Sequence, residues 1–219
     1  MKDTKIKVCL FDMDGTLLDT ERIYQRFWYQ SVRDLGYDIT QEQLLEFRSM
    51  GFTFGVEKMT EMTGDPDAYE KIRTHRKEMM NPYMETIDIP LKPTVKEALE
   101  LLKASGLRLA VATATMKDLT EEYLTRVGIR EYFDELISAK MVKLGKPAPD
   151  VYLYACEVMG VNPEEAVALE DAPNGVRSAA AAGCKVIMVP DLTRADESLN
   201  NLIEYEADTL LDAAHFILK

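Results

Sequence analysis

Two aspartates separated by a single residue follow the first apolar run of the chain. Asp12 and Asp14 come directly after the run at residues 7–11, and Gly15 follows them and permits the chain to turn. Two carboxylates this close repel each other, so a site that holds both needs a cation or a shared proton. If the run is a strand of a parallel sheet, the turn brings both side chains to the sheet edge where open α/β folds bind ligands.

Polar groups also follow later apolar runs. Thr113 and the amide of Ala114 lie where a run gives way to a helix, an arrangement that suits an anion. Glu170 and Asp171 form a second acidic pair, and paired carboxylates suit a hard cation such as Mg²⁺. Lys146, held between a glycine and a proline, can neutralise both a phosphate and the acids. Each group alone also fits turn or capping chemistry, but their recurrence at successive strand ends favours one shared site.

The elements that must position these groups alternate between apolar runs and amphipathic helices. Strands are predicted at residues 7–11, 107–112, 135–139, 166–169 and 185–189. Helices are predicted from a capping box at Thr94 and Glu97, at 119–127, at 151–158, from Asn162 and at 173–182. Short, nearly continuous apolar runs are typical of strands buried on both faces. The alternation predicts an α/β fold, with a Rossmann-like parallel sheet flanked by helices.

Residues 20 to about 84 break this alternation and read as several helices with no strand between them. Helices are expected at 21–35, from a capping box at Thr40 and Gln43, and from Asp65 toward Pro82. Within the last of these, the basic residues around His75 read as a solvated helix face. An all-helical block after the first strand indicates an inserted domain. We therefore predict a core at residues 1–16 and 88–219 and a helical cap at residues 17–87.

Charge and composition restrict the classes of partner. The 219 residues contain 26 Lys and Arg against 38 Asp and Glu, which gives a formal net charge of −12 and argues against nucleic acid or an anionic membrane as partner. No apolar run reaches the roughly 18 residues of a membrane span, and the run after the basic start is too short for a signal peptide. The three cysteines are expected to be reduced core residues of a cytoplasmic protein.

The motifs, in their order along the chain, resemble those of the haloacid dehalogenase-like superfamily of phosphotransferases. The resemblance is carried by Phe-Asp-Met-Asp-Gly-Thr-Leu-Leu-Asp-Thr at 11–20, Gly-Lys-Pro-Ala-Pro-Asp at 145–150 and Glu-Asp-Ala-Pro-Asn-Gly-Val at 170–176. It covers essentially the whole chain. The position of the helical insert is similar to that in the subfamily of β-phosphoglucomutase-like and sugar-phosphate phosphatase proteins.

This resemblance implies a Mg²⁺-dependent phosphatase that acts on a small phosphorylated metabolite such as a sugar phosphate. It implies that Asp12 is the nucleophile, which becomes an aspartyl-phosphate, and that Asp14 is the general acid and base. The implied Mg²⁺ ligands are Asp12, the backbone carbonyl of Asp14, and Asp171. Glu170 is implied either to bind the ion directly or to contact the groups that bind it. The implied phosphate-binding groups are Thr113, the Ala114 amide and Lys146. Thr20, Arg48 and Gly51 are expected to face the site from the cap.

Two other functions share part of this pattern. A β-phosphoglucomutase would use the same aspartyl-phosphate, but mutase-like members carry Val-Ser-Arg after the cap glycine and Lys-Asn after the hydroxyl motif. Here those stretches read Phe52-Thr53-Phe54 and Met116-Lys117, so we favour the hydrolase. A phosphoacceptor signalling module would also use Asp, Thr, Lys and Mg²⁺. It has no role for the helical insert or for Asp14.

Overall fold

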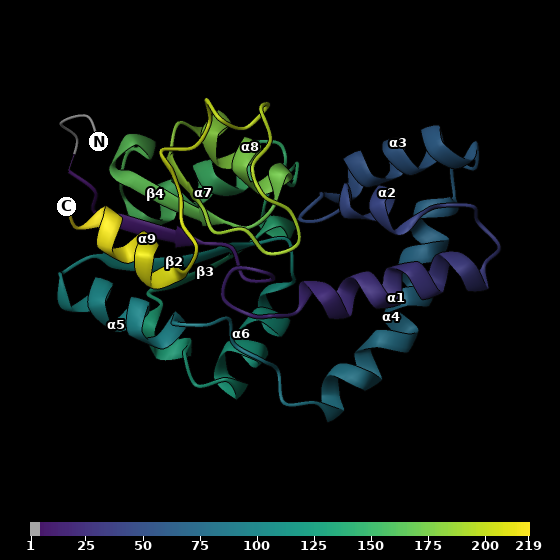
Figure 1. The fold of residues 1–219 in the computed structure, drawn as a ribbon, viewed down its shortest axis with the longest axis horizontal. Helices are drawn as coiled ribbons and strands as arrows, with labels where there is room; N and C mark the ends of the chain where they lie inside the picture. Colours follow the sequence, from purple (N-terminus) through teal and green to yellow (C-terminus); the bar gives the residue numbers. More distant parts are fainter. Residues whose placement is uncertain (1–4) are drawn as a thin grey trace.

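The computed structural model describes residues 5–219, in which a six-stranded parallel sheet lies between two layers of helices (Figure 1). The strands are β1 (Val8–Phe11), β2 (Arg108–Thr113), β3 (Glu135–Ser138), β4 (Ala166–Glu170), β5 (Lys185–Met188) and β6 (Tyr205–Glu206). Their order across the sheet is β3-β2-β1-β4-β5-β6. This architecture confirms the predicted α/β fold. The basic start at residues 1–4, considered above for a signal peptide, lies outside the described residues.

Strand β1 occupies the middle of the sheet, between β2 and β4. Phe11 pairs with Val111 on one side and with Leu169 on the other. All four residues of β1 are buried, as expected for a strand covered on both faces. Because the three strands are parallel and in register, the polar residues that follow them emerge side by side at one edge.

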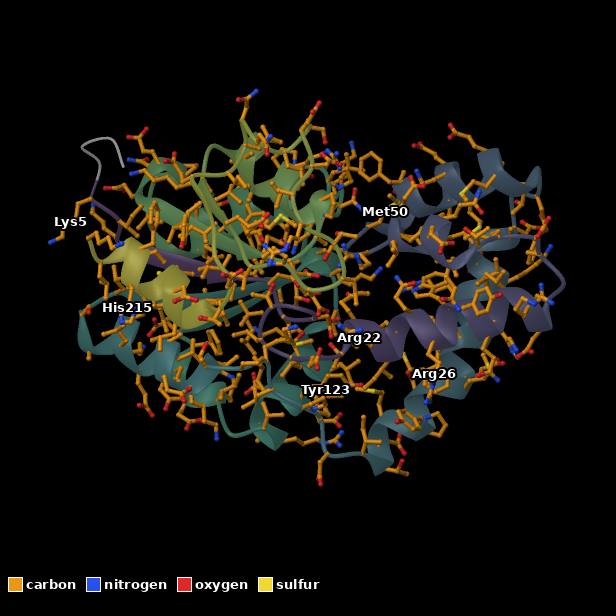
Figure 2. All side chains as sticks on the ribbon, in the orientation of Figure 1. Lys5, Arg22, Arg26, Met50, Tyr123 and His215 are labelled. Atoms are coloured by element: carbon orange, nitrogen blue, oxygen red, sulfur yellow. The ribbon has the colours of Figure 1, made fainter. Side chains whose placement is uncertain are left out.

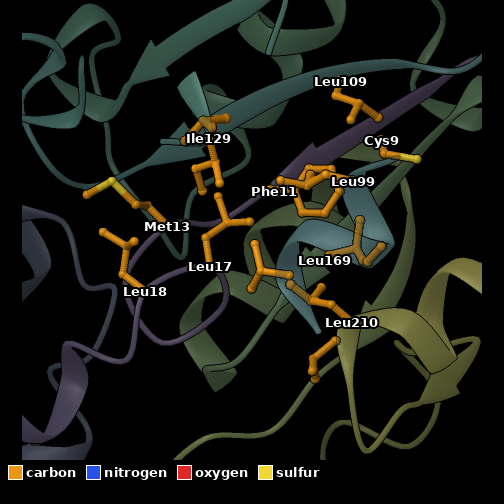
Figure 3. Close-up of a cluster of buried hydrophobic side chains, with 14 of the residues drawn as sticks. Cys9, Phe11, Met13, Leu17, Leu18, Leu99, Leu109, Ile129, Leu169 and Leu210 are labelled. Atoms are coloured by element: carbon orange, nitrogen blue, oxygen red, sulfur yellow. The ribbon is translucent and has the colours of Figure 1, made fainter. Parts of the chain in front are cut away.

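Alternate side chains of β1 pack against two different layers of helices. Cys9 and Phe11 belong to a cluster with α5 (Val95–Ala104), α6 (Lys117–Arg126) and α9 (Leu210–Ile217), part of which Figure 3 shows. Val8 and Leu10 face the opposite cluster, with α7 (Asp150–Met159) and α8 (Pro173–Ala182). The period of two along the strand thus produces the three-layer arrangement.

The first four helices after β1 lie to one side of the sheet (Figure 1). They are α1 (Glu21–Asp34), α2 (Gln41–Leu45), α3 (Phe52–Thr63) and α4 (Ala68–Thr86). They share a hydrophobic cluster of their own, which includes Trp28, Leu44, Met59, Tyr69 and Ile72. The predicted capping box at Thr40 and Gln43 is present at the start of α2. We call these helices the cap, and its exact boundaries at 17 and 87 stay a prediction.

Two predicted helix starts are confirmed only in part: the start at Thr94 is correct without its capping box, and the motif at Asn162 does not lead into an α-helix. Thr94 does precede α5, but it has φ 62° and makes no side-chain cap, because its hydroxyl accepts a hydrogen bond from the amide of Leu211 at 3.3 Å and so serves α9. The motif at Asn162 closes its capping box with Glu165, yet it forms only the 3₁₀ turn η3 (Pro163–Glu165). The next five residues are all buried and continue as β4.

Other elements extend beyond their predicted limits or were not predicted. Helix α4 continues through Pro82 to Thr86, since buried Met80 and Met84 hold the flanking turns in the core. Strand β6 has two residues and no apolar run to reveal it. Helix α9 begins with an N-terminal cap, in which the Thr209 side chain accepts a hydrogen bond from the Asp212 amide. This helix was not predicted, although Thr209 is a typical capping residue.

The cysteines and the helix lengths bear on two of the composition arguments. Cys9, Cys156 and Cys184 are free and buried, as expected, although the sulfurs of Cys156 and Cys184 lie 3.8 Å apart. Across the described residues, no helix combines the length and the apolar character that crossing a membrane would require. A cytoplasmic location stays a prediction.

Candidate active site

The carboxyl ends of β1, β2 and β4 bring the predicted core residues to one place. Asp12 follows β1, and its amide donates to the carbonyl of Leu169 at 3.0 Å. Thr113 ends β2, and Glu170 ends β4. All three of these polar side chains are buried. The sheet edge predicted from the spacing of the motifs is therefore where these groups meet.

Lys146 binds two of the acids. Its Nζ donates to Asp12 Oδ1 at 2.6 Å, to Glu170 Oε1 at 2.6 Å and to the carbonyl of Ala112 at 3.0 Å. The side chain is fully buried. Burial opposes its charge, but the negative charges of Asp12 and Glu170 outweigh this effect and raise the pKa of Lys146 above its ordinary value. The lysine therefore stays cationic and holds the Asp12 carboxylate in one orientation.

Glu170 has a second partner that the sequence did not reveal. The phenol of Tyr152, on α7, donates a hydrogen bond to the Oε1 atom that Lys146 also binds. Burial raises the pKa of Glu170 to about 7, against the lowering effect of Lys146. Tyr152 lies within the helix predicted at 151–158, and no motif in the sequence marked it.

Three buried carboxylate oxygens beside this network have no hydrogen-bond partner among the described residues. They are Asp12 Oδ2, Glu170 Oε2 and Asp171 Oδ1. One oxygen from each of these acids can be chosen so that all lie within 4.8 Å of one another. Burial, and then the charges of Glu21 and Asp12, raise the pKa of Asp171 well above its ordinary value. An unpaired, all-oxygen set of this kind fits a hard divalent cation such as Mg²⁺.

Two glycines allow these acids to approach the backbone. A Cβ at Gly15 would lie 2.5 Å from Asp171 Oδ2, and one at Gly175 would lie 1.9 Å from Glu170 Oε2. Gly15 also has φ 88°, in the left-handed region that favours glycine. The turn after β1 therefore requires glycine for its conformation and for the space that Asp171 fills.

Asp14 is held by two hydroxyl groups. Thr20 Oγ1 donates to Asp14 Oδ1 at 2.7 Å, and Thr115 Oγ1 donates to Oδ2 at 2.8 Å. Burial and the nearby charge of Asp12 raise the pKa of Asp14 to about 6, although both hydroxyls act in the opposite direction. Such a carboxyl can exchange a proton near neutral pH. Thr20 was predicted to face the site. Thr115, the second hydroxyl of the Thr-Ala-Thr motif, was not.

The segment between α2 and α3 reaches the acids from the cap. Arg48 is buried, and its Nη1 donates to Asp171 Oδ2 at 3.1 Å. Its Nη2 donates to the hydroxyl of Thr193. The Asn174 amide donates to the carbonyls of Glu46 at 2.9 Å and Arg48 at 2.8 Å, which fixes this segment on α8. Asn174 belongs to the Glu-Asp-Ala-Pro-Asn-Gly motif, but its contact with the cap was not predicted.

Cap and core also touch through glycine backbones. The amide of Gly51 donates to the carbonyl of Lys146 at 2.7 Å. A Cβ at Gly51 would lie only 2.8 Å from the Cα of Gly145. In this conformation the cap is closed over the sheet edge, near the labelled Met50 in Figure 2.

A cavity of about 260 Å³ lies between cap and core. Its core wall includes Asp12, Asp14, Thr113, Ala114 and Thr115. Its cap wall includes five aromatic residues, Tyr24, Trp28, Phe47, Phe52 and Tyr69, and the basic residues Arg48, Arg73 and Arg76. The size suits a small metabolite. The structure therefore brings all the predicted site residues to this cavity or to the acids beneath it, and it adds Arg73 and Arg76.

Comparison with known proteins places the chain in a family. The sequence model of the haloacid dehalogenase-like hydrolases matches residues 9–189. The chain belongs to this family. The resemblance read from the motifs is thus confirmed.

Relatives of this haloacid dehalogenase-like hydrolase match over most of their length. Protein CbbY of Cereibacter sphaeroides is 35% identical, over 95% of this chain and 92% of the relative. The phosphorylated carbohydrates phosphatase of Thermotoga maritima is 34% identical, over 83% of this chain and 84% of the relative. The crystal structure of CbbY from Rhodobacter sphaeroides in complex with phosphate superposes with a TM-score of 0.75, at 31% identity, over 94% and 96% of the two chains.

Proposed function

We propose that this haloacid dehalogenase-like hydrolase is a Mg²⁺-dependent phosphatase, which hydrolyses a small sugar phosphate through a phosphorylated Asp12. One observation carries the proposal. Three buried carboxylates with unpaired oxygens lie beside a fully buried lysine, under a cavity of about 260 Å³ between cap and core. The acids need a cation, and the cation with Lys146 would provide the positive charge that a phosphate dianion needs.

Asp12, Asp171 and Glu170 are the residues that would hold the ion. When bound, Mg²⁺ supplies charge that stabilises the phosphoryl oxygens in the transition state. Asp14 would contribute its backbone carbonyl, as the resemblance implies. Arg48 donates to Asp171 Oδ2, which leaves Asp171 Oδ1 for the ion.

Asp12 would act as the nucleophile. Its carboxylate attacks phosphorus, the bond between phosphorus and the sugar oxygen breaks, and the leaving oxygen takes a proton from Asp14. Asp14 then accepts a proton from water as that water attacks the phosphorylated Asp12. The bond between phosphorus and Asp12 breaks, inorganic phosphate leaves, and both carboxyl groups return to their starting states.

The remaining residues position these groups. Thr20 and Thr115 orient the Asp14 carboxyl, whose pKa of about 6 lets it give and take a proton near neutral pH. Thr113, the Ala114 amide and Lys146 would hold the phosphoryl oxygens. The closed cap excludes bulk water from the reacting atoms.

Two observations support a sugar phosphate as the substrate class. The cavity combines aromatic faces with polar groups, which suits the faces and hydroxyls of a sugar. The Thermotoga maritima relative carries the name phosphorylated carbohydrates phosphatase.

The test is phosphate release from a panel of sugar phosphates with and without Mg²⁺. We expect steady release that stops with a chelator, returns with Mg²⁺, and falls by at least about 10⁴-fold in Asp12→Asn. Asp34→Asn, which changes an exposed carboxylate on α1, is the matched control and should behave as wild type. Activity that survives complete removal of divalent metal would contradict the proposal. Interconversion of β-glucose 1-phosphate and glucose 6-phosphate with little free phosphate would instead establish the mutase.

A further inference from the structure

The cavity contains basic side chains that the proposed phosphoryl chemistry does not use. Arg73 and Arg76 line it from α4, Lys140 from the 3₁₀ turn η2 (Ala139–Met141), and Lys143 from the loop that follows. Within residues 5–219, none of these four forms an ion pair with a carboxylate. They come from both cap and core, so they surround the cavity when the cap is closed.

Arg76 shows most clearly that these cations lack a directly paired carboxylate. The side chain is 9% exposed, and its guanidinium lies over the ring of Trp28 at 4.6 Å and over that of Tyr24 at 5.2 Å. Its Nε is buried without a hydrogen-bond partner, and its Nη1 reaches only the sulfur of Met80, at 4.0 Å. A guanidinium keeps its charge even where burial lowers its pKa. Burying such a cation without a counter-ion is costly.

The neighbouring cations also act on one another. Burial and the charge of Arg73 lower the pKa of Lys140. Burial, Arg73, Arg76 and Lys140 together lower the pKa of Lys77, the next basic residue along α4. The charge of Arg76 also lowers the pKa of Asp14. The positive charge therefore extends from the Asp14 side of the cavity to the meeting point of cap and core.

Other basic residues of the cap are arranged differently. Lys58 pairs with Glu46, and Lys71 pairs with Asp65 at 3.0 Å. Arg26, labelled in Figure 2, stacks on aromatic rings as Arg76 does, but it is exposed and lies outside the cavity lining. The expectation of a solvated helix face around His75 is therefore wrong for Arg76. Among the buried basic residues of the described part of the chain, Arg48 and Lys146 pair with acids and Arg76 does not.

We propose that the substrate carries a second anionic group, in addition to the phosphate that is cleaved, and that Arg73, Arg76 and Lys140 bind it. The inference rests on the proposed phosphatase site at Asp12 and narrows its substrate class. A second phosphate or a carboxylate supplies the counter-charge that the described residues lack. A sugar monophosphate without a second anion leaves the buried Arg76 with no directly paired anion.

The experiment compares substrates that differ only in the second anion. The pairs are fructose 6-phosphate with fructose 1,6-bisphosphate, glucitol 6-phosphate with 6-phosphogluconate, and glycerol 3-phosphate with 3-phosphoglycerate. The first pair adds a phosphate, and the other two replace a hydroxymethyl group by a carboxylate at two chain lengths. We expect KM to fall at least about tenfold in one pair or more, because charge-assisted hydrogen bonds are strong. No preference in any pair would overturn the proposal.

Variants test whether these residues are responsible. Arg73→Gln changes a half-buried side chain and Lys140→Gln an exposed one, so both variants are expected to fold. Each should raise KM for the preferred doubly anionic substrate about tenfold more than for its neutral partner. Arg76→Lys, which keeps the charge, should lose less of the preference than Arg76→Met. Arg26→Gln is the matched control and should leave both members of a pair unchanged. Equal effects of Arg73→Gln on both members would overturn the assignment.

Binding separates this proposal from the proposed function. The Kd values of the same pairs are measured by calorimetry on Asp12→Asn, where turnover does not intervene. A tenfold preference for the doubly anionic member supports the second-anion site even if wild type releases no phosphate from any of them. Equal Kd values together with active wild type overturn the second-anion site and leave the phosphatase standing.

Discussion

The core wall and the cap wall of the cavity differ in how their charged side chains are paired. Beneath the core wall, Lys146 binds Asp12 and Glu170, and Arg48 of the cap donates to Asp171. On the cap wall, Arg73 and Arg76 lie against aromatic rings and pair with no described acid. The network around Lys146 is complete without substrate, apart from the place for an ion. On the cap wall, the proposed anionic group of the substrate would supply the counter-charge.

This difference follows from how each wall is positioned. Core residues follow strands whose register fixes them against one another. Cap residues lie on helices that meet the core through a few contacts, such as the hydrogen bond from Gly51 to Lys146. We therefore expect core substitutions to abolish turnover and cap substitutions to change which substrate is used.

Removing the central cation should have the largest effect. Lys146→Met leaves Asp12 and Glu170 buried and unneutralised, so we expect activity to fall by at least about 10⁴-fold. The free energy of unfolding should fall by about 3–5 kcal/mol, as when one partner of a buried ion pair is removed. Phosphate release and urea unfolding measure the two effects.

Two further variants show whether burial causes this loss. The double variant Lys146→Met/Glu170→Gln lacks one of the two buried carboxylates left without a cation. Part of the stability should therefore return, and none of the activity. Lys103→Met breaks a half-exposed pair with Asp134 and should cost no more than about 1 kcal/mol. Equal losses at Lys146 and Lys103 would contradict the distinction between the core site and the surface.

Replacing the proposed general acid should have the next largest effect. Asp14→Asn keeps the shape but cannot exchange a proton, so steady turnover should fall by about 10³-fold. An aryl phosphate with a good leaving group needs no acid in the first step, so it should still give a burst of one phenol per site. Rapid-mixing kinetics measure the burst, and a full steady rate with the aryl substrate would contradict both roles of Asp14.

The contact between cap and core at Gly51 should be disturbed by one added methyl group. Gly51 has φ −67°, which alanine adopts without strain, but the new Cβ would lie 2.8 Å from the Gly145 backbone. Gly51→Ala should therefore hold the cap slightly open and lower kcat/KM about tenfold, with a small change in stability. Glu57→Ala, on an exposed residue of α3 outside the cavity lining, is the control. Wild-type kinetics for Gly51→Ala would show that closure is not required.

The smallest expected effect concerns stability against pH in the metal-free protein. Asp14 and Glu21 have pKa values raised to about 6 and about 8, chiefly by burial, whereas the unfolded chain ionises near pH 4. Between these values the folded protein binds more protons, so stability falls as pH rises, by at most about 1.4 kcal/mol per pH unit for each group. Thermal unfolding in chelator from pH 5 to 8 should show the decline.

Two comparisons sharpen this measurement. Mg²⁺ favours the ionised acids, so it should reduce the slope, and Asp14→Asn should reduce it without metal. A melting temperature that rises from pH 5 to 8 in chelator would contradict the burial of these carboxyls.

Sequence reasoning predicted the core wall far better than the cap wall, for a physical reason. Asp12, Thr113 and Glu170 stand at strand ends, and parallel strands place their carboxyl ends at one edge whatever else the chain does. Arg73 and Arg76 reach the cavity only because α4 packs beside α1 in a particular way. Helical spacing shows which residues share a face but not which neighbour that face will meet.

The same limit explains the smaller errors. Thr94 has the composition of a helix cap, but the start of a helix far along the chain takes its hydroxyl. Tyr152 has the spacing of a core residue, and only the folded sheet shows that its phenol reaches Glu170. Local pattern predicts what a segment can do, and tertiary contact decides between the possibilities.

The place of β1 in the sheet also sets the order in which the parts of the molecule become available during synthesis. Val8 pairs with Arg108 on one side and with Ala166 on the other, so the strand that carries Asp12 is made first and gains its second neighbour late. All four cap helices, which end at Thr86, are made before either neighbour. Long-range pairing of this kind is slow to form. On the ribosome, the region proposed to select the substrate is therefore complete before the region proposed to react with it can be assembled.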